Sequence, residues 1–145
     1  MKIGFIGLGN MGAPMAANLA AHHDIIGFDT VAQPNGVALA GSAKDAATDA
    51  DVVVTMLPNG DILRAVASEI HPAMKPDAIH LDCSTVDVDS ARAVAAQAEH
   101  HNLQAIDAPV SGGIGGAQAG TLTFMAGGPD EAFARIKPLV DIMGQ

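Results

Sequence analysis

Six short apolar runs, separated by stretches of helical periodicity, constrain the fold of this chain more than any other feature. Most are rich in Val and Ile, and each is closely followed by Gly, Pro or Asp. The runs cover residues 3–6, 25–28, 52–57, 79–81, 105–106 and 122–125. Such runs predict strands that are buried on both faces, because a parallel sheet carries helices on both sides. The sequence therefore predicts an α/β fold with a doubly wound, mainly parallel sheet and right-handed crossovers.

The segments between these runs are predicted to form the helices that cover the sheet. Helices are expected at residues 11–19, 31–44, 62–66, 87–101 and 133–143. The Ala-rich helix over 87–101 would place Val88 and Val94 on one buried face. Ser84 and Asp87 form a capping pattern at its start. Pro138 is expected to kink or restart the last helix.

Length and charge limit what the chain can be. Its 145 residues leave room for one domain, and a hydrophobic fraction of 49% suffices for a core. The 16 acidic and 7 basic residues give a net charge of −9, which argues against nucleic-acid and anionic-membrane partners. The single cysteine, Cys83, forms no internal disulfide, and no apolar run reaches the roughly 18 residues of a membrane span. A cytoplasmic location is expected.

The residues after the first run fit the pattern G-x-G-x-x-G. They read Gly7-Leu8-Gly9-Asn10-Met11-Gly12 and stand between a predicted strand and a predicted helix, where dinucleotide binding needs them. In that setting Gly7 permits a tight turn, Gly9 lets the backbone approach a pyrophosphate, and Gly12 lets helix and strand pack closely. The helix N-terminus then offers free N–H groups to the phosphates. The pattern favours a Rossmann-type dinucleotide-binding domain over an ordinary Gly-rich turn.

Asp29 ends the second apolar run and supplies the acid that such domains carry about 20 residues after the glycines. A carboxylate there accepts hydrogen bonds from the ribose hydroxyls of NAD and repels the 2′-phosphate of NADP. No Lys or Arg follows at residues 30–34 to bind that phosphate. The sequence therefore predicts NAD as the preferred cofactor, although a solvated turn Asp remains the alternative.

The residues after the later runs are further candidates, because ligands of doubly wound sheets bind outside the carboxyl ends of the strands. These ends carry small polar groups and exposed glycines suited to a cofactor ring and a small anionic substrate. The three segments are Leu57-Pro58-Asn59-Gly60, Asp82-Cys83-Ser84-Thr85 and Asp107-Ala108-Pro109-Val110-Ser111-Gly112-Gly113. Any one of them alone could be an ordinary turn.

Together these segments resemble the β-hydroxyacid dehydrogenases, and the resemblance extends along the whole chain. Residues 5–19, 107–113 and 120–128 match that family's amino-terminal signature, its substrate-loop motif and the segment that follows it. The resemblance implies that Leu57, Pro58 and Thr85 contact the nicotinamide half of NAD. It also implies that Ser111, Gly112 and Gly113 bind the substrate. The contact of the family's Asn after the Leu-Pro pair is not carried over, because this sequence reads Asn59-Gly60-Asp61-Ile62 there.

The resemblance implies reversible oxidation of a small 3-hydroxy acid, 3-hydroxyisobutyrate in valine catabolism, to its semialdehyde by hydride transfer to NAD. Such a reaction needs a group that takes the hydroxyl proton. The seven Lys and Arg residues stand away from the predicted carboxyl edge. The six His residues and Cys83 show no catalytic or metal-binding spacing, and His80 is expected to be a satisfied core histidine.

In the family a Lys in a following all-helical domain supplies the acid–base group, and no counterpart is expected here. We expect residues 1–145 to be a dinucleotide-binding domain without that catalytic domain, inactive alone. The family's homo-oligomer is expected to form through the same helical domain. The stripe of Leu139, Val140 and Met143 is then expected to be left uncovered and exposed.

Three alternatives stay open. A reductase of tartronate semialdehyde, succinate semialdehyde or glyoxylate would share the same motifs. A non-catalytic nucleotide-binding module would use the glycine turn and Asp29 equally well, but it has no need of the loop from Asp107 to Gly113. A methyltransferase also has a Gly-rich first turn, but it is disfavoured by the match at both Gly9–Gly12 and Ser111–Gly113.

Overall fold

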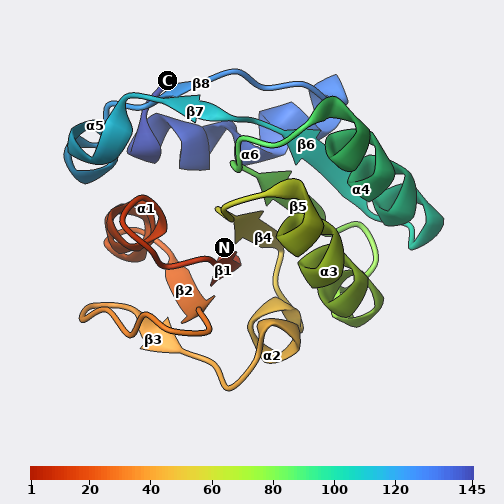
Figure 1. Ribbon diagram of the computed structural model, residues 1–145, viewed down its shortest axis with the longest axis horizontal. Helices are drawn as coiled ribbons and strands as arrows, with labels where there is room; N and C mark the ends of the chain where they lie inside the picture. Colours follow the sequence, from red (N-terminus) through yellow and green to blue (C-terminus); the bar gives the residue numbers. More distant parts are fainter.

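The computed structural model describes residues 1–145 and contains one six-stranded sheet, in which every neighbouring pair is parallel (Figure 1). The strands are β1 Lys2–Ile6, β2 Asp24–Phe28, β3 Ala38–Leu39, β4 Val52–Thr55, β5 Ile79–Asp82 and β6 Gln104–Asp107. Their spatial order is β3-β2-β1-β4-β5-β6. This is the order of the dinucleotide-binding folds, and it reverses between β1 and β4. The predicted fold class is confirmed.

Helices cover both faces of the sheet (Figure 1). They are α1 Gly12–Ala20, α2 Ala43–Ala47, α3 Gly60–Ile70, α4 Val88–His100, α5 Gly113–Ala119 and α6 Asp130–Met143, with a 3₁₀ turn at His71–Ala73. Helices α1 and α6 pack on one face, and α2, α3 and α4 pack on the other.

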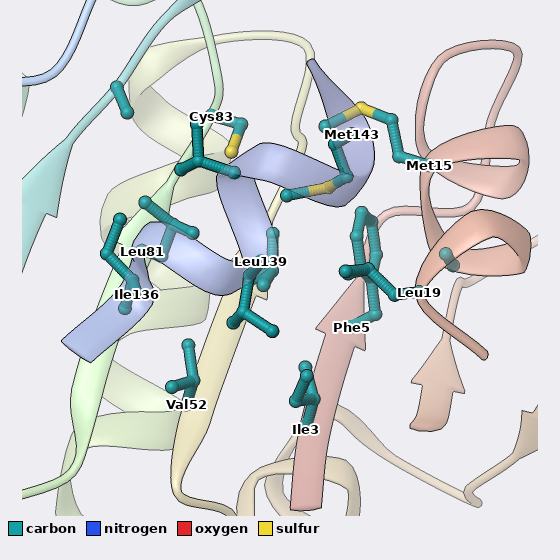
Figure 2. Packing of buried hydrophobic residues seen from close by; sticks show 14 of the residues in the cluster. Ile3, Phe5, Met15, Leu19, Val52, Leu81, Cys83, Ile136, Leu139 and Met143 are labelled. Atoms are coloured by element: carbon teal, nitrogen blue, oxygen red, sulfur yellow. The ribbon is translucent and has the colours of Figure 1, made fainter. Parts of the chain in front are cut away.

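The larger part of the core lies between the sheet and helices α1 and α6 (Figure 2). Ile3 and Phe5 of β1 point toward Leu139 of α6 in this layer, and all three are fully buried. Val140 and Met143 are also buried. The expectation that the last helix leaves an exposed apolar stripe is therefore wrong, because the chain's own sheet covers that stripe.

The last apolar run does not join the main sheet. Residues 122–125 contribute only β8, Thr123–Phe124, which pairs antiparallel with β7, Val110–Ser111, in a separate ribbon. Met125 is 56% exposed, and Leu122 is buried beside the end of α6. The sixth place in the sheet is taken by β3, within the segment 31–44 that was expected to be an irregular helix. The run over 52–57 also ends early as a strand, at Thr55.

The predicted cap of α4 and the predicted kink at Pro138 of α6 both differ from what the structure shows. Asp87 alone caps α4, because its carboxylate accepts the N–H of Ser90, while the Ser84 hydroxyl accepts the N–H of Leu57. Val88 is 62% exposed, so the buried face of α4 starts at Ser90 instead. Helix α6 continues through Pro138 without a restart. Because Pro138 has no N–H, the carbonyl of Ala134 lacks its helical partner. Both residues are exposed, so water can bind that carbonyl.

Candidate functional site

The glycine turn joins β1 to α1 at the carboxyl edge of the sheet, and its geometry needs glycine at two of its three positions. Gly7 has φ +101°, and a Cβ there would lie 2.2 Å from the carbonyl oxygen of Met56. A Cβ on Gly12 would lie 1.7 Å from the carbonyl oxygen of Gly7. Gly9 is exposed and has nothing within 4 Å of a built Cβ. The turn therefore packs tightly at both ends and leaves an open approach to the backbone at its centre.

Asp29 follows β2 and ties the glycine turn to the loop beyond that strand. Its Oδ2 accepts the N–H of Leu8 at 2.8 Å, and its Oδ1 accepts the N–H groups of Val31 and Ala32, each at 2.9 Å. Partial burial alone would raise the pKa of Asp29, but these backbone donors hold that pKa below its ordinary value. The carboxylate is therefore ionised at neutral pH and has a fixed orientation beside the turn.

A cavity of about 530 Å³ lies between the glycine turn, Asp29 and the residues after β4. We call it the glycine-turn cavity. The predicted site residues that line it are Gly7, Gly9, Asn10, Met11, Gly12, Asp29, Leu57 and Pro58. Leu8 does not line it, because its side chain is buried in the core and only its N–H takes part, through Asp29. Thr85 is exposed after β5 and is also outside the lining.

Several lining residues are absent from the predicted site. They are Ile6, Phe28, Thr30, Ala43, Met56, Ile62, Val66 and Glu69. Ile62 and Val66 lie on α3, where helical periodicity marks them as core positions. Ile62 is 40% exposed, so at this end of α3 the apolar stripe faces the cavity instead. Periodicity cannot distinguish a residue that packs on the sheet from one that lines a ligand site.

The predicted substrate loop lies apart from this cavity. Ser111 is in β7, and Gly112 precedes α5 with φ +136° while Gly113 has φ +64°. All three residues are exposed, and none lines the glycine-turn cavity. The structure therefore brings eight of the ten predicted cofactor residues together and places the three predicted substrate residues on a separate, solvent-facing segment.

A buried chain of hydrogen bonds runs from the interior to the loop after β4. His71 Nε2 is 2.9 Å from His80 Nδ1, and His80 Nε2 is 2.9 Å from the hydroxyl of Thr55. That hydroxyl donates to Asp82 Oδ1 at 2.8 Å, so its single proton is used and His80 Nε2–H must donate to it. His80 Nδ1 then accepts from His71 Nε2–H.

The same chain continues to the backbone of the candidate site. Asp82 Oδ1 also accepts the N–H of Ser84, whose hydroxyl accepts the N–H of Leu57 at 2.8 Å. Burial lowers the pKa of His80 to about 4, and burial together with His80 and His101 lowers that of His71 to about 3. The prediction of a satisfied core histidine at position 80 is confirmed. Sequence spacing gave no sign that His71 is its partner.

No basic side chain lines the glycine-turn cavity. Lys75 pairs with Asp51, Lys137 pairs with Asp141, and Arg64 donates to the hydroxyl of Ser90. Cys83 is fully buried, and burial raises the pKa of its thiol. No group of three or more His, Cys, Asp or Glu residues is arranged to hold a metal ion. None of the helices combines the length and apolar character needed to cross a bilayer.

Known proteins share both the sequence and the fold. Residues 2–145 match the family described as the NAD binding domain of 6-phosphogluconate dehydrogenase. The "Probable 3-hydroxyisobutyrate dehydrogenase" of Mycobacterium tuberculosis is 46% identical over 148 residues, which cover 97% of this chain and 50% of that protein. The NAD-dependent L-serine dehydrogenase of Pseudomonas aeruginosa is 43% identical, over 99% of this chain and 52% of that protein.

A solved structure has a similar fold and sequence. Mycobacterium tuberculosis 3-hydroxyisobutyrate dehydrogenase with L-serine matches with a TM-score of 0.93 and 44% identity, over 98% of this chain and 51% of that chain. The chain spans about half the length of the curated relatives it matches.

Proposed function

Because this chain belongs to the family of the NAD binding domain of 6-phosphogluconate dehydrogenase, we propose that it holds NAD for a dehydrogenase that oxidises a small 3-hydroxy acid. Its similarity to 3-hydroxyisobutyrate and L-serine dehydrogenases supports a substrate that carries a carboxylate and a β-hydroxyl. We favour 3-hydroxyisobutyrate, oxidised to methylmalonate semialdehyde. The observation that carries the proposal is the glycine-turn cavity, which joins the three-glycine turn to the ionised Asp29.

The cavity fits a dinucleotide on grounds of this structure alone. Gly9 leaves space over exposed backbone at the N-terminal end of α1, where unpaired N–H groups and the helix dipole favour a pyrophosphate. Leu57 and Pro58 would border the nicotinamide end, and Ile62 and Val66 offer apolar surface for a base. When bound, NAD supplies the hydride acceptor for the oxidation of an alcohol carbon.

We propose NAD over NADP because of Asp29. Its carboxylate is held by three backbone N–H groups, so it cannot easily turn away from a ribose bound beside it. A 2′-phosphate at that position would meet a fixed negative charge, and no Lys or Arg lines the cavity to offset it. Calorimetric titration with NADH and NADPH tests this preference. Equal affinity for the two would refute the role given to Asp29.

Ser111, Gly112 and Gly113 are proposed to hold the substrate, and a Lys from the helical part of the family is proposed to take the hydroxyl proton. The only ionisable side chains lining the glycine-turn cavity are Asp29 and Glu69, and Asp29 is already committed to backbone donors. The 145-residue chain should therefore bind NADH without turnover. Oxidation of 3-hydroxyisobutyrate by this chain would contradict the assignment. A chain that binds no NADH at about millimolar ligand would contradict the cofactor proposal itself.

A non-catalytic nucleotide-binding module is the second candidate, because the exposed loop at Ser111–Gly113 lies outside the cavity. The two functions differ in what happens when 3-hydroxyisobutyrate is added to the chain loaded with NADH. A substrate site should change the fluorescence of the nicotinamide, and Ser111→Ala should weaken that response. A pure nucleotide module should show no response. Reductases of tartronate semialdehyde, succinate semialdehyde or glyoxylate would respond to those acids instead.

A cytoplasmic homo-oligomer is proposed on the family resemblance, with assembly through the helical part and a role in valine catabolism. The structure is consistent with a reducing compartment, because its single cysteine is buried and free. Analytical sedimentation of the 145-residue chain tests the proposal about how the oligomer assembles. A stable dimer of this chain alone would refute assembly through the helical part.

A further inference from the structure

A second cavity of about 480 Å³ lies between α4 and the strands β5 and β6, and it shares no residue with the glycine-turn cavity. Its lining comprises His80, Asp82, Ala91, Val94, Ala95, Glu99, Leu103, Gln104, Ala105, Ile106, Asp107, Gly127, Gly128 and Pro129. We call it the acidic cavity, because three of these residues are acids and none is Lys or Arg. Asp82 is bonded to Ser84 of the candidate site, and Asp107 begins the loop that leads to Ser111, but the proposed dehydrogenase function gives the space itself no role.

Two of the acids face the cavity side by side. Asp82 of β5 and Asp107 of β6 are register neighbours in the parallel pair, so strand spacing of about 4.8 Å separates their backbones. Glu99 of α4 is the third acid of the lining. The three acids of the lining thus come from two strands and one helix, and Glu99 is an exposed residue.

One of these acids has an unused acceptor. Asp82 is only 4% exposed, and although its Oδ1 is bonded to Thr55 and Ser84, its Oδ2 has no partner. A buried acceptor left unpaired is destabilising. A ligand that brings hydrogen-bond donors to Asp82 would satisfy this atom.

The groups around the acids offer them no counter-charge. Burial raises the pKa of Asp82, and burial together with the charge of Asp82 raises that of Asp107. His80, which faces them from β5, has both ring nitrogens bonded and a pKa lowered by burial. Glu99 adds only negative charge from α4. A cation is therefore the charge type that this space favours.

We propose that the acidic cavity binds a small organic cation, an alkylguanidinium, with its head between Asp82 and Asp107 and its chain along the apolar lining. A guanidinium carries five donors in a plane, so it can bridge two neighbouring carboxylates. It is also less strongly hydrated than an ammonium group, which favours it in a buried site. Val94, Ala95 and Leu103 supply the apolar wall for the chain.

Calorimetric titration with n-butylguanidinium tests the proposal, with n-butylurea as an uncharged analogue of matched shape. We expect saturable binding of the cation below about 10 mM and none of the urea. Asp107→Asn should weaken binding roughly tenfold or more, because it removes one charged partner. The side chain of Asp107 makes no hydrogen bond within the chain, so this variant should fold. Glu131→Gln, which removes an exposed acid of α6 outside the cavity, is the matched control and should bind as the parent does.

Ala95→Met provides a second variant that leaves every acid in place. Ala95 is an exposed position of α4 on the cavity wall, and Met keeps the helix while filling the space. It should abolish binding of the cation and leave NADH affinity unchanged. Three results would each overturn the proposal: no saturable binding by n-butylguanidinium, equal binding by n-butylurea, or undiminished binding by both Asp107→Asn and Ala95→Met. None of these depends on whether the chain binds NADH.

Discussion

Lowering the pH from about 7.5 to about 5 should destabilise this protein through His71 and His80. Both rings are buried, with 1% and 0% exposure, and both are neutral in the folded chain because burial lowers their pKa values to about 3 and about 4. An unfolded histidine has a pKa of about 6.5. The unfolded chain therefore binds more protons than the folded chain in this range. The stabilisation that comes from keeping both rings neutral is fully present above about pH 6.5 and is lost progressively as the pH drops toward about 4.

The size of the effect follows from these values. At pH 5 an unfolded histidine is almost fully protonated, whereas His80 in the folded chain is protonated about one time in ten. The linkage relation then gives a loss of about 2 kcal/mol for His80, and His71 adds a similar amount. The two together cost roughly 4 kcal/mol, which is a large share of the 5–15 kcal/mol that folded domains typically have.

Urea unfolding at the two pH values measures this loss. With a slope of about 2 kcal/mol per molar, the midpoint should fall by about 2 M. Asp82 and Asp107 act in the opposite direction, because their pKa values are raised in the folded chain and they gain protons there first. Variants are therefore needed to isolate the contribution of the two histidines to the loss of stability. His80→Gln should remove about half of the fall, and His71→Gln combined with His80→Gln should remove most of the rest, because His23, whose pKa is also lowered by burial, still contributes.

His22→Gln is the matched control, because this histidine is exposed and should leave the fall as in the parent. Asp29, Asp51 and Asp87 have lowered pKa values and lose their stabilising effect only below about pH 3.8, outside the measured window. If the double variant loses as much stability as the parent between the two pH values, the reasoning about buried neutral histidines is wrong.

Three further experiments test the site and the core. Ser84→Ala removes the acceptor for the N–H of Leu57 and should weaken NADH binding several-fold, as measured by calorimetry. Ser68→Ala, which changes an exposed serine of α3, is the control. An unchanged NADH affinity of Ser84→Ala would exclude a positioning role for Ser84. Gly12→Ala should lower the free energy of unfolding by about 3 kcal/mol, because the new Cβ would clash with the carbonyl of Gly7. Gly9→Ala should leave the free energy of unfolding unchanged and weaken NADH binding. Equal stability of the two variants would refute the assignment of a packing role to Gly12 and a binding role to Gly9. Leu139→Ala, at a fully buried position of α6, should cost about 2–5 kcal/mol in urea unfolding, and a loss below about 1 kcal/mol would show that α6 does not pack on the sheet.

Much of the fold could be read from local sequence patterns. Strands β1, β2, β4, β5 and β6 each follow from a short apolar run that ends at a turn signal, because such runs are recognisable within a few residues. The short run that did not become a sheet strand, at 122–125, has the same local composition as the others. Its backbone pairs instead with β7 and with residues 143–145, and pairing between separate segments is invisible in a window of a few residues.

Some residues of the candidate site could likewise be predicted from local sequence patterns, and others could not. The roles of Gly7, Gly9 and Gly12 were predictable, because the sign of φ and the closeness of backbone segments at this turn are local demands. Ile62 and Val66 were missed, because an apolar helix position has the same sequence signal whether it contacts a sheet or a ligand. The apolar stripe at Leu139 was read as uncovered, because the sequence does not say which surface a helix meets.

The sequence by itself determined an α/β sheet, a dinucleotide turn and a carboxylate at the second strand, since each is encoded by residues close together in the chain. Only the tertiary structure decided that His71 and His80 form a buried pair, that Asp82 supports Ser84 and Leu57, and that Asp82 and Asp107 share a cavity. These contacts join residues on different strands and helices. Their existence depends on sheet order and register, which arise from the packing of the whole chain.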